Sequence, residues 1–319
     1  MYLNPQNSKK TTWPWSNNIP DFPETMPNGR EWPKISIITP SFNQGNFIEE
    51  TIRSIVMQGY PDLEYIVMDG GSRDKTVDVL KKYDNFITKW VSEPDYGQTH
   101  AINKGIKYAT GEIIAYLCSD DMYLPGSFKI AASFFADHPD VSMIYGNIIH
   151  LNKKGEVIEK VKNDDFDYDR LLSWILYIPQ PSTFLRRIVV QETGLFDETL
   201  NLAMDFDYWI RVGLKHNIHH ISEYLASDRV YPETKTQSKY SDSIDEHIYI
   251  RDKLFSGESI PKKILSKKSQ YYGSVYYFAA RGHILRFKLT AGMAYLLRSI
   301  KLDPKNTVKL FFCDLRKVV

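Results

Sequence analysis

The strongest constraint on this chain is a regular alternation of strand and helix patterns that begins after Lys34. Residues 35–39 (Ile-Ser-Ile-Ile-Thr) form a nearly continuous β-branched run, which is typical of a strand buried on both faces. Helical spacing follows in residues 46–58, and the alternation continues to a fourth strand pattern in residues 111–115. Strands that alternate with helices of about 10–13 residues form βαβ units. The sequence therefore predicts an α/β fold with a parallel sheet.

Carboxylates follow three of these strand patterns. Asp69 ends the second, Asp95 follows the third, and Asp120 and Asp121 follow the fourth. Ligands of open α/β sheets bind at this carboxyl edge. Adjacent carboxylates repel one another unless a cation lies between them, and Mg²⁺ prefers one or two carboxylates plus substrate phosphates. The pattern predicts a metal–diphosphate site; a solvated Asp-Asp turn is the alternative for the pair taken alone.

The charge of the chain is divided unevenly along its length. The net charge is only +1, but residues 261–319 hold 13 Lys and Arg against 2 Asp and Glu. An acidic body is therefore followed by a strongly basic tail. The two cysteines, Cys118 and Cys313, exclude a disulfide framework and a cysteine-rich zinc site, and they are typical of a reducing compartment.

The first 33 residues are rich in Pro, Asn and Trp, and their prolines are spaced too closely for a regular element. We expect an extended strap whose tryptophans dock on the body. The sequence shows no basic-then-apolar signal peptide and no run near the roughly 18 apolar residues of a spanning helix. We therefore expect a cytoplasmic protein.

These observations predict three parts: a Trp/Pro-rich strap in residues 1–33, an α/β domain in residues 34–240 and a basic helical subdomain in residues 241–319. Residues 232–243 are polar and unpatterned, which predicts a mobile loop able to close over a ligand. Residues 271–297 have the pattern of an antiparallel helix pair.

Five motifs occur in a fixed order along the predicted domain. They are residues 35–44, 64–76, 93–105, 111–121 and 204–211. In this order they resemble family 2 glycosyltransferases with the GT-A fold, and the Trp-Pro-Trp strap is similar to a bacterial branch that builds polysaccharides. The resemblance covers roughly residues 12–236. It implies a Rossmann-like, mixed sheet of the nucleotide-diphospho-sugar transferase type, flanked by helices, with a C-terminal helical subdomain beyond it.

The resemblance also implies a nucleotide-sugar donor, inversion at the anomeric carbon and a role for each matched residue. Asp120 would bind Mg²⁺ or Mn²⁺ with Asp121 beside it, and Asp205 would be the catalytic base. Asp95 and Lys104 would face the ribose and diphosphate. The residues expected against the nucleotide are Pro40, Ser41, Asn43, Asp69, Gly70 and Ser72.

Three positions depart from the family's pattern. Cys118 stands where the first Asp of the DXD-type motif is expected, and Met204 replaces the acid that usually precedes the base. Tyr231 stands where related proteins often have a His that supplies a third metal ligand. Asp120 and Asp205 are both retained.

The chemistry of glycosyl transfer requires two of these groups. The transition state resembles an oxocarbenium ion and its leaving group is a diphosphate, so a cation near Asp120 offsets growing negative charge. The acceptor hydroxyl must lose its proton on the opposite face of the sugar, and Asp205 supplies a carboxylate for this step. Asp207 is the competing candidate for the base.

The basic tail has several possible partners. A basic, aromatic-rich segment binds anionic membrane surfaces, which suits a polyprenyl-diphosphate-linked acceptor and predicts peripheral contact with the inner face of the cell membrane. Docking on the acidic body or on a second subunit is the alternative. No recognition motif for nucleic acid accompanies the charge, so no nucleic-acid partner is expected.

The sequence thus predicts a metal-dependent inverting glycosyltransferase of the hexosyl- or N-acetylhexosaminyl-transferase class. It would take a nucleotide-diphosphate sugar, UDP-linked before GDP- or dTDP-linked, to a glycan or lipid-linked hydroxyl in surface polysaccharide biosynthesis. A non-catalytic GT-A-like module that binds nucleotide or glycan is the alternative. A nicotinamide dehydrogenase is excluded because the first strand lacks a Gly-x-Gly-x-x-Gly turn.

Overall fold

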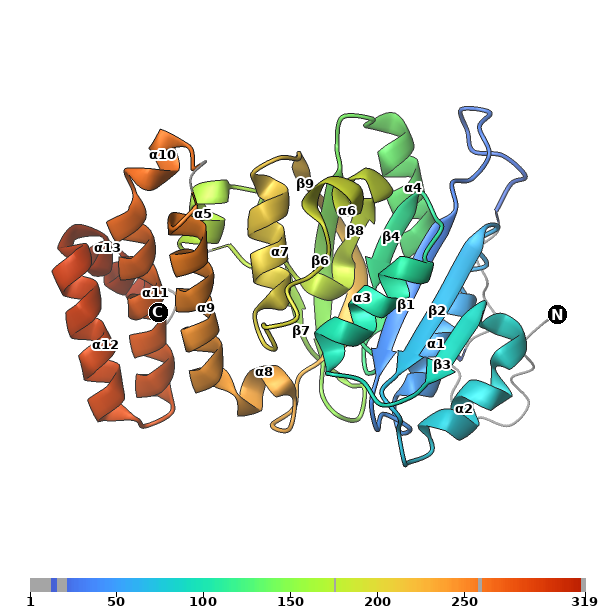
Figure 1. The fold of residues 1–319 in the computed structure, drawn as a ribbon, viewed down its shortest axis with the longest axis horizontal. Helices are drawn as coiled ribbons and strands as arrows, with labels where there is room; N and C mark the ends of the chain where they lie inside the picture. Colours follow the sequence, from blue (N-terminus) through green and yellow to red (C-terminus); the bar gives the residue numbers. More distant parts are fainter. Residues whose placement is uncertain (1–12, 16–21, 175, 258–259, 317–319) are drawn as a thin grey trace. The chain divides into compact units, whose positions relative to one another are not determined.

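The computed structural model describes residues 13–15, 22–174, 176–257 and 260–316 (Figure 1). The chain divides into two compact units. The sheet unit comprises the described parts of Met1–Asp165, Ile178–Asn201 and Arg211–Tyr231, and the helical unit those of Phe166–Tyr177, Leu202–Ile210 and Pro232–Val319. The helical unit thus takes in two stretches that precede its main part in the sequence. The domain boundaries after residues 33 and 240 stay predictions.

The sheet unit is built on nine strands formed by the described residues. Their bounds are β1 (Ile35–Ser41), β2 (Leu63–Asp69), β3 (Lys89–Ser92), β4 (Ile113–Tyr116), β5 (Met122–Tyr123), β6 (Met143–Leu151), β7 (Val157–Val161), β8 (Thr183–Arg186) and β9 (Ile218–Arg229).

The sheet is mixed, as predicted. Its order is β3-β2-β1-β4-β8-β6-β9-β5, with β7 paired to β6. The first four strands in this order are parallel, β8 is antiparallel to β4 and to β6, and β9 runs parallel to β6. The parallel part matches the β-branched runs of the sequence, because every residue of β1 and β4 is buried. Polar residues that follow β1 to β4 consequently meet at one edge.

Helices cover the sheet, and α3 packs over β1 and β2 (Figure 1). The helices of the sheet unit are α1 (Ile48–Val56), α2 (Thr76–Lys82), η1 (Asp84–Phe86), α3 (Gln98–Tyr108), α4 (Ser127–Asp137), η2 (Gln180–Ser182) and α6 (Arg187–Thr193). Gly105 lets α3 approach the sheet closely, since a Cβ there would lie 2.4 Å from Cγ2 of Ile38. The predicted helices flanking the sheet are confirmed.

Tryptophans of the first 33 residues contact the sheet unit where the structure describes them. The Trp13 indole Nε1 donates to the Tyr123 carbonyl over 2.8 Å, and the Arg53 guanidinium lies 4.5 Å from the centroid of the Trp15 ring. Trp32 is buried in the hydrophobic core. The rest of the predicted strap, residues 1–12 and 16–21, lies outside the described residues.

The helical unit contains α5 (Tyr168–Leu172), α8 (Lys235–Ser238), α9 (Tyr240–Phe255), α10 (Lys262–Leu265), α11 (Lys268–Leu285), α12 (Leu289–Leu302) and α13 (Pro304–Arg316). A further helix, α7 (Met204–Gly213), begins in it. Helices α11 and α12 form the predicted antiparallel pair, and α11 also packs against α9 and α13 (Figure 1). No described helix is both long and apolar enough to cross a membrane.

The prediction of a mobile loop in residues 232–243 is wrong, because this stretch contains α8 and the start of α9. Ile244 and Ile250 of α9 are buried, and Arg251 of the same helix is fully buried and donates to the Leu172 carbonyl of α5. Tertiary burial thus extends a helix across polar residues whose own pattern indicates none.

Candidate active site

The connections after β1 and β2 are joined by hydrogen bonds at the carboxyl edge of the sheet. Ser41 pairs in register with Asp69, and the Gly70 N–H donates to the Ser41 carbonyl over 2.8 Å. The Asn43 N–H donates to the Ser72 hydroxyl over 2.7 Å. Asn43 has a φ of 53°, in the left-handed region that Asn tolerates better than most residues. The two loops therefore form one surface.

The Ser41 hydroxyl, at the end of β1, is a buried polar group with no partner within the described part of the chain. Its side chain is only 5% exposed. Pro40, the residue before Ser41 in β1, is also buried. Since burying a hydroxyl without a hydrogen bond costs about 1–3 kcal/mol, an orphaned hydroxyl at a ligand-binding edge calls for an explanation.

The Asp69 carboxylate is held rigidly by its neighbours. Its Oδ2 accepts from the Ser72 N–H over 2.9 Å and from the Ser92 hydroxyl over 2.6 Å, and its Oδ1 accepts from the Ser72 hydroxyl. Ser92 is the last residue of β3 and pairs in register with Asp69. The three strand ends thus share one hydrogen-bond network around this carboxylate.

Asp95 and Lys104 lie at the same edge. A Cβ on Gly70 would lie 2.8 Å from Oδ2 of Asp95, so the absence of a side chain at Gly70 makes room for this carboxylate. The Asp95 Oδ1 accepts a hydrogen bond from the Gly97 N–H over 2.8 Å. Gly97 is the residue directly before α3. Lys104, on α3, forms an ion pair with Glu93.

The end of β4 carries the two adjacent carboxylates. Its Leu117 N–H donates to the Ile38 carbonyl of β1 over 2.8 Å, so β4 ends beside β1. Asp121 is buried, and its Oδ1 accepts from the Arg229 N–H over 3.2 Å. The Asp120 Oδ2 accepts from the Tyr231 hydroxyl over 3.3 Å.

Arg229 holds this turn from β9. Its guanidinium donates to the Asp120 carbonyl, forms an ion pair with Glu50 of α1 and lies 5.0 Å from the centroid of the Phe47 ring. Sequence reasoning missed Arg229, Glu50 and also Ser92. No local pattern marks these residues, because each acts on a partner distant in the sequence.

Burial decides the electrostatics of the pair. It raises the pKa of Asp120, and burial together with the charges of Asp120 and Asp228 raises the pKa of Asp121 well above its ordinary value. Burial and the nearby Asp120 raise the pKa of Tyr231 to about 12, so its hydroxyl remains a donor at neutral pH. A divalent cation would offset the repulsion between the two carboxylates.

Cys118, in place of an acid, makes different contacts. The Gln98 amide donates to its sulfur over 3.2 Å, and its thiol lies 3.8 Å from Oε1 of Gln180. The Gln180 amide donates in turn to the Tyr116 carbonyl over 2.6 Å. The described residues contain no group of three or more His, Cys, Asp or Glu side chains arranged to hold a metal ion.

Asp205 belongs to the helical unit, in the first turn of α7. Its Oδ1 accepts from the Phe206 N–H over 2.8 Å. Burial, with the Glu246 carboxylate as a further contribution, raises the pKa of Asp205 from 3.8 to about 6. Glu246 also accepts from the N–H groups of Leu202 and Ala203, each over 2.8 Å, and so fixes the start of α7.

Asp207, the competing candidate, lies in a different environment. It is 3% exposed, and its Oδ1 lies 3.4 Å from the Lys253 ammonium. Its carboxylate is thus engaged in an ion pair with Lys253 of α9.

The geometry therefore brings most of the predicted residues together and leaves one in the other unit. That residue is Asp205, which belongs to the helical unit. The residues gathered at the ends of β1 to β4 are Pro40, Ser41, Asn43, Asp69, Gly70, Ser72, Asp95, Lys104, Asp120 and Asp121.

Comparison with protein families identifies this edge. Residues 36–194, which contain all four strand ends, match the model of glycosyl transferase family 2. The chain belongs to glycosyl transferase family 2. The predicted family is thereby confirmed, and so is the prediction that the chain is a glycosyltransferase.

Relatives of this family 2 glycosyltransferase agree in sequence and fold. An uncharacterized glycosyltransferase of Rickettsia typhi is 26% identical over 272 residues, which cover 82% of this chain and 85% of the relative. The crystal structure of S. aureus TarS 1-349 in complex with UDP-GlcNAc has a TM-score of 0.65 at 20% identity, covering 86% of this chain and 82% of that chain. The mannosyltransferase PcManGT from Pyrobaculum calidifontis, in complex with GDP-Man and Mn²⁺, has a TM-score of 0.58 at 18% identity, covering 86% and 88%. These structures confirm the GT-A fold.

Proposed function

We propose that this glycosyltransferase transfers a sugar from a nucleotide-diphosphate donor, UDP-linked in the first instance, to an acceptor hydroxyl with inversion at the anomeric carbon. The observation that carries the proposal is the buried Ser41 hydroxyl, which has no partner within the described residues and lies at the carboxyl edge of four parallel strands. A ligand at that edge supplies the missing partner.

The donor end is proposed to bind along the joined loops after β1 and β2. Pro40, Ser41 and Asn43 contact the nucleoside, and the Asp69 carboxylate accepts from the base. Asp69 is suited to this role because Ser72 and Ser92 hold it rigidly, while a carboxylate has about four acceptor positions. Gly70 and Ser72 line the same surface.

Asp95 and Lys104 are proposed to bind the ribose and the diphosphate. The Asp95 carboxylate is an acceptor suited to ribose hydroxyls, and it lies against Gly70, where no side chain blocks it. Lys104 is a cation at the same edge, paired with Glu93. A diphosphate attracts that cation more strongly than a single partly exposed carboxylate does.

Asp120, with Asp121 beside it, is proposed to hold Mg²⁺ or Mn²⁺. The residues fit such an ion because hard cations of this kind bind one or two carboxylates together with substrate phosphates. Burial raises the pKa of both carboxyl groups, and the charge of Asp120 raises that of Asp121 further; a bound cation would favour the ionised form of each. When bound, the cation offsets the charge that grows on the leaving diphosphate.

Asp205 is proposed to accept the proton of the attacking hydroxyl. A carboxyl group with a pKa of about 6 is ionised at neutral pH and is a stronger proton acceptor than an ordinary Asp. The Phe206 N–H and the start of α7, fixed by Glu246, orient it.

The acceptor is proposed to be a glycan or a polyprenyl-diphosphate-linked glycan used for a surface polysaccharide, with the sugar of the hexosyl or N-acetylhexosaminyl class. The basic C-terminal region is proposed to contact the membrane that carries such an acceptor. Support comes from its composition, 13 Lys and Arg against 2 Asp and Glu in residues 261–319.

Calorimetric titration with UDP, GDP and dTDP, each with Mn²⁺ and with EDTA, tests the donor site. We expect UDP to bind in the presence of Mn²⁺ and the affinity to fall at least tenfold with EDTA or in Asp120→Ala. The nucleotide that binds then selects the sugars for a hydrolysis screen, in which Asp205→Asn serves as the inactive variant.

Asp62→Ala is a matched control for Asp120→Ala, because it removes an exposed carboxylate from the turn before β2. It should bind nucleotide like the wild type. Failure of all three nucleotides to bind in either condition would contradict the donor site and favour a non-catalytic module.

A further inference from the structure

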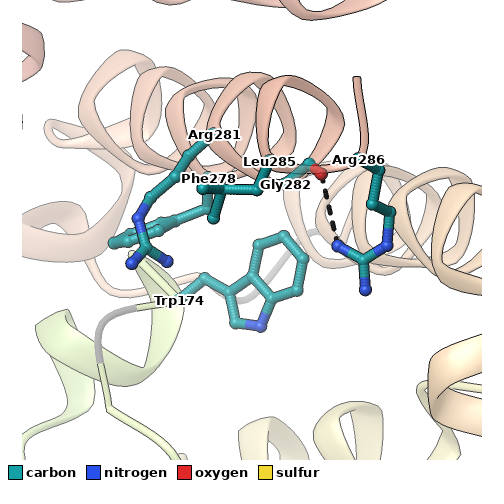
Figure 2. A pocket seen from close by; sticks show the side chains of 6 residues that line it. All are labelled: Trp174, Phe278, Arg281, Gly282, Leu285 and Arg286. Carbon is teal, nitrogen blue, oxygen red and sulfur yellow. Dashed lines mark hydrogen bonds between the residues drawn. The ribbon is translucent and has the colours of Figure 1, made fainter. Parts of the chain in front are cut away.

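The helical unit contains a cavity that the proposed donor site does not use. It has a volume of about 250 Å³ and is lined by one residue that follows α5 and five from the C-terminal part of α11 and the turn after it. The lining residues are Trp174, Phe278, Arg281, Gly282, Leu285 and Arg286 (Figure 2). Figure 2 shows the Trp174 indole facing α11, with the two arginines on either side of it.

Trp174 is held in an unusual conformation. Its φ is 58°, and its N–H donates to the Leu171 carbonyl over 2.9 Å. Its ring packs against His247 at 4.1 Å between centroids and against Phe278 at 6.2 Å. A bulky residue in the left-handed region costs about 1–3 kcal/mol, and such residues cluster at ligand-binding sites.

A buried cation fixes the turn that carries this indole. The Arg251 Nε donates to the Leu172 carbonyl over 3.0 Å, and its Nη1 donates to the His247 carbonyl over 2.7 Å. Burial and the charge of Arg251 lower the pKa of His247 well below its ordinary value, so His247 is a neutral stacking partner at pH 7. The wall of the cavity formed by Trp174 is therefore rigid.

The opposite side of the cavity is strongly cationic. Two of its six lining residues are arginines and none is acidic. Residues 261–302 contain nine Lys and Arg and no Asp or Glu. At the N-terminal end of α11, Asp169 accepts a hydrogen bond from Tyr271 and Asp252 accepts one from Tyr272. Guanidinium groups match the geometry of phosphate oxygens.

Exposed apolar side chains adjoin these arginines. Leu285, which lines the cavity, is 64% exposed; Phe287 in the following turn is 92% exposed, and Leu289 at the start of α12 is 60% exposed. Phe287 lies in the turn between α11 and α12 and has a positive φ of 59°. Cationic groups beside a protruding apolar turn are suited to a molecule with an anionic head and an apolar chain.

We propose that this cavity binds the phosphate group of an anionic amphiphile. The phosphate lies between Arg281 and Arg286 against the Trp174 indole, and the apolar chain follows Leu285 toward Phe287. The cavity volume of about 250 Å³ is slightly below the range of about 300–1,000 Å³ that is typical of pockets for drug-sized ligands. It therefore suits a small group such as a lipid head group. The inference does not depend on the donor site, since none of the lining residues belongs to it.

Co-sedimentation of the full chain with phosphatidylglycerol vesicles tests the proposal, with phosphatidylcholine vesicles as the neutral surface. Arg281→Gln/Arg286→Gln removes two exposed charges of the cavity, and Lys301→Gln/Lys305→Gln removes two exposed charges outside it. We expect the cavity variant to bind phosphatidylglycerol vesicles at least tenfold more weakly than the lysine variant. Leu285→Ser should weaken this binding as well.

Two results would overturn the proposal. General attraction to the membrane depends on the number of charges, so equal weakening by the two double variants would exclude a specific site. Inorganic phosphate that displaces the protein at concentrations no higher than that of the lipid head groups would show a site for free phosphate instead. UDP binding with Mn²⁺, measured on the same variants, should equal that of the wild type, which separates this test from that of the donor site.

Discussion

The Tyr231 hydroxyl donates a hydrogen bond to the Asp120 carboxylate over 3.3 Å. The family resemblance in the sequence implied a His at this position, so the sequence alone indicated Tyr231 only as a departure from the expected metal ligand. In the structure its phenol, with a pKa of about 12, remains protonated and donates to the carboxylate that we propose holds the metal ion. Groups that orient a metal ligand in this way typically change metal affinity by about 10–100-fold.

Tyr231→Phe is therefore expected to weaken Mn²⁺ binding in the presence of UDP by about tenfold, because it removes the hydrogen bond and leaves the ring. Calorimetric titration of the UDP-saturated protein with Mn²⁺ measures this. Tyr108→Phe, which removes the hydroxyl of an exposed tyrosine on α3, is the matched control and should bind Mn²⁺ normally. Equal affinities for the two variants would contradict the role of Tyr231.

Ser41→Ala should weaken UDP binding about tenfold while leaving the free energy of unfolding unchanged or raising it. The reason is that the hydroxyl is buried without a partner in the described residues, so its removal relieves a cost in the ligand-free protein. Ser36→Ala, on the same strand, should do the reverse. The Ser36 hydroxyl donates to Glu64 over 2.5 Å, so its loss should lower stability by about 1–2 kcal/mol without changing UDP affinity. Urea unfolding and calorimetry give both quantities.

The pH dependence of transfer should follow Asp205. Its pKa of about 6 means that the carboxylate, the form that accepts a proton, is lost as the pH falls through 6. We expect kcat/KM to fall about tenfold per pH unit below this value and to be level above it. In Asp207→Asn, kcat/KM should be lower overall but should fall with pH below 6 in the same way as in the wild type. A profile that remains level down to pH 5 would exclude Asp205 as the base.

The same shift predicts a change in stability. The folded pKa of Asp205 is raised from 3.8 to about 6, so the protonated form is favoured in the native state. That stabilising contribution is complete below about pH 4 and is lost as the pH rises through about 6. Asp205→Asn should therefore be more stable than the wild type at pH 8, by up to about 3 kcal/mol, and the difference should vanish near pH 4. Urea unfolding at both pH values measures it; a less stable variant at pH 8 would contradict the shift.

The sequence was sufficient for elements whose signals are local. The β-branched run at residues 35–39 predicts β1, which extends to Ser41, and the carboxylates at strand ends predict the edge at which Asp69 and Asp95 meet. The placement of Asp120 at the same edge was also predicted, because it follows the fourth strand pattern in the sequence. In each case the residue type and the period of the strand carry the information.

Other features could not be predicted because they arise from distant contacts. Arg229 is one residue of a twelve-residue strand, and only the fold brings it to the Asp120 carbonyl and to Glu50. The start of α9 lies in a polar stretch without helical spacing. The left-handed Trp174 has no signal in the sequence, since Asn and Gly are the residues that usually indicate that conformation.

Gly70→Ala should weaken UDP binding and lower stability through a single contact. A Cβ at Gly70 would lie 2.8 Å from Oδ2 of Asp95, closer than real Cβ contacts, so the carboxylate must move away from the edge. We expect a loss of about 1–3 kcal/mol in the free energy of unfolding. A double-mutant cycle with Asp95→Ala identifies the cause, because the two substitutions couple if the carboxylate is what the methyl group displaces. The double variant should then be about as stable as Asp95→Ala alone. Additive losses would mean that the added methyl group acts through a contact other than the Asp95 carboxylate.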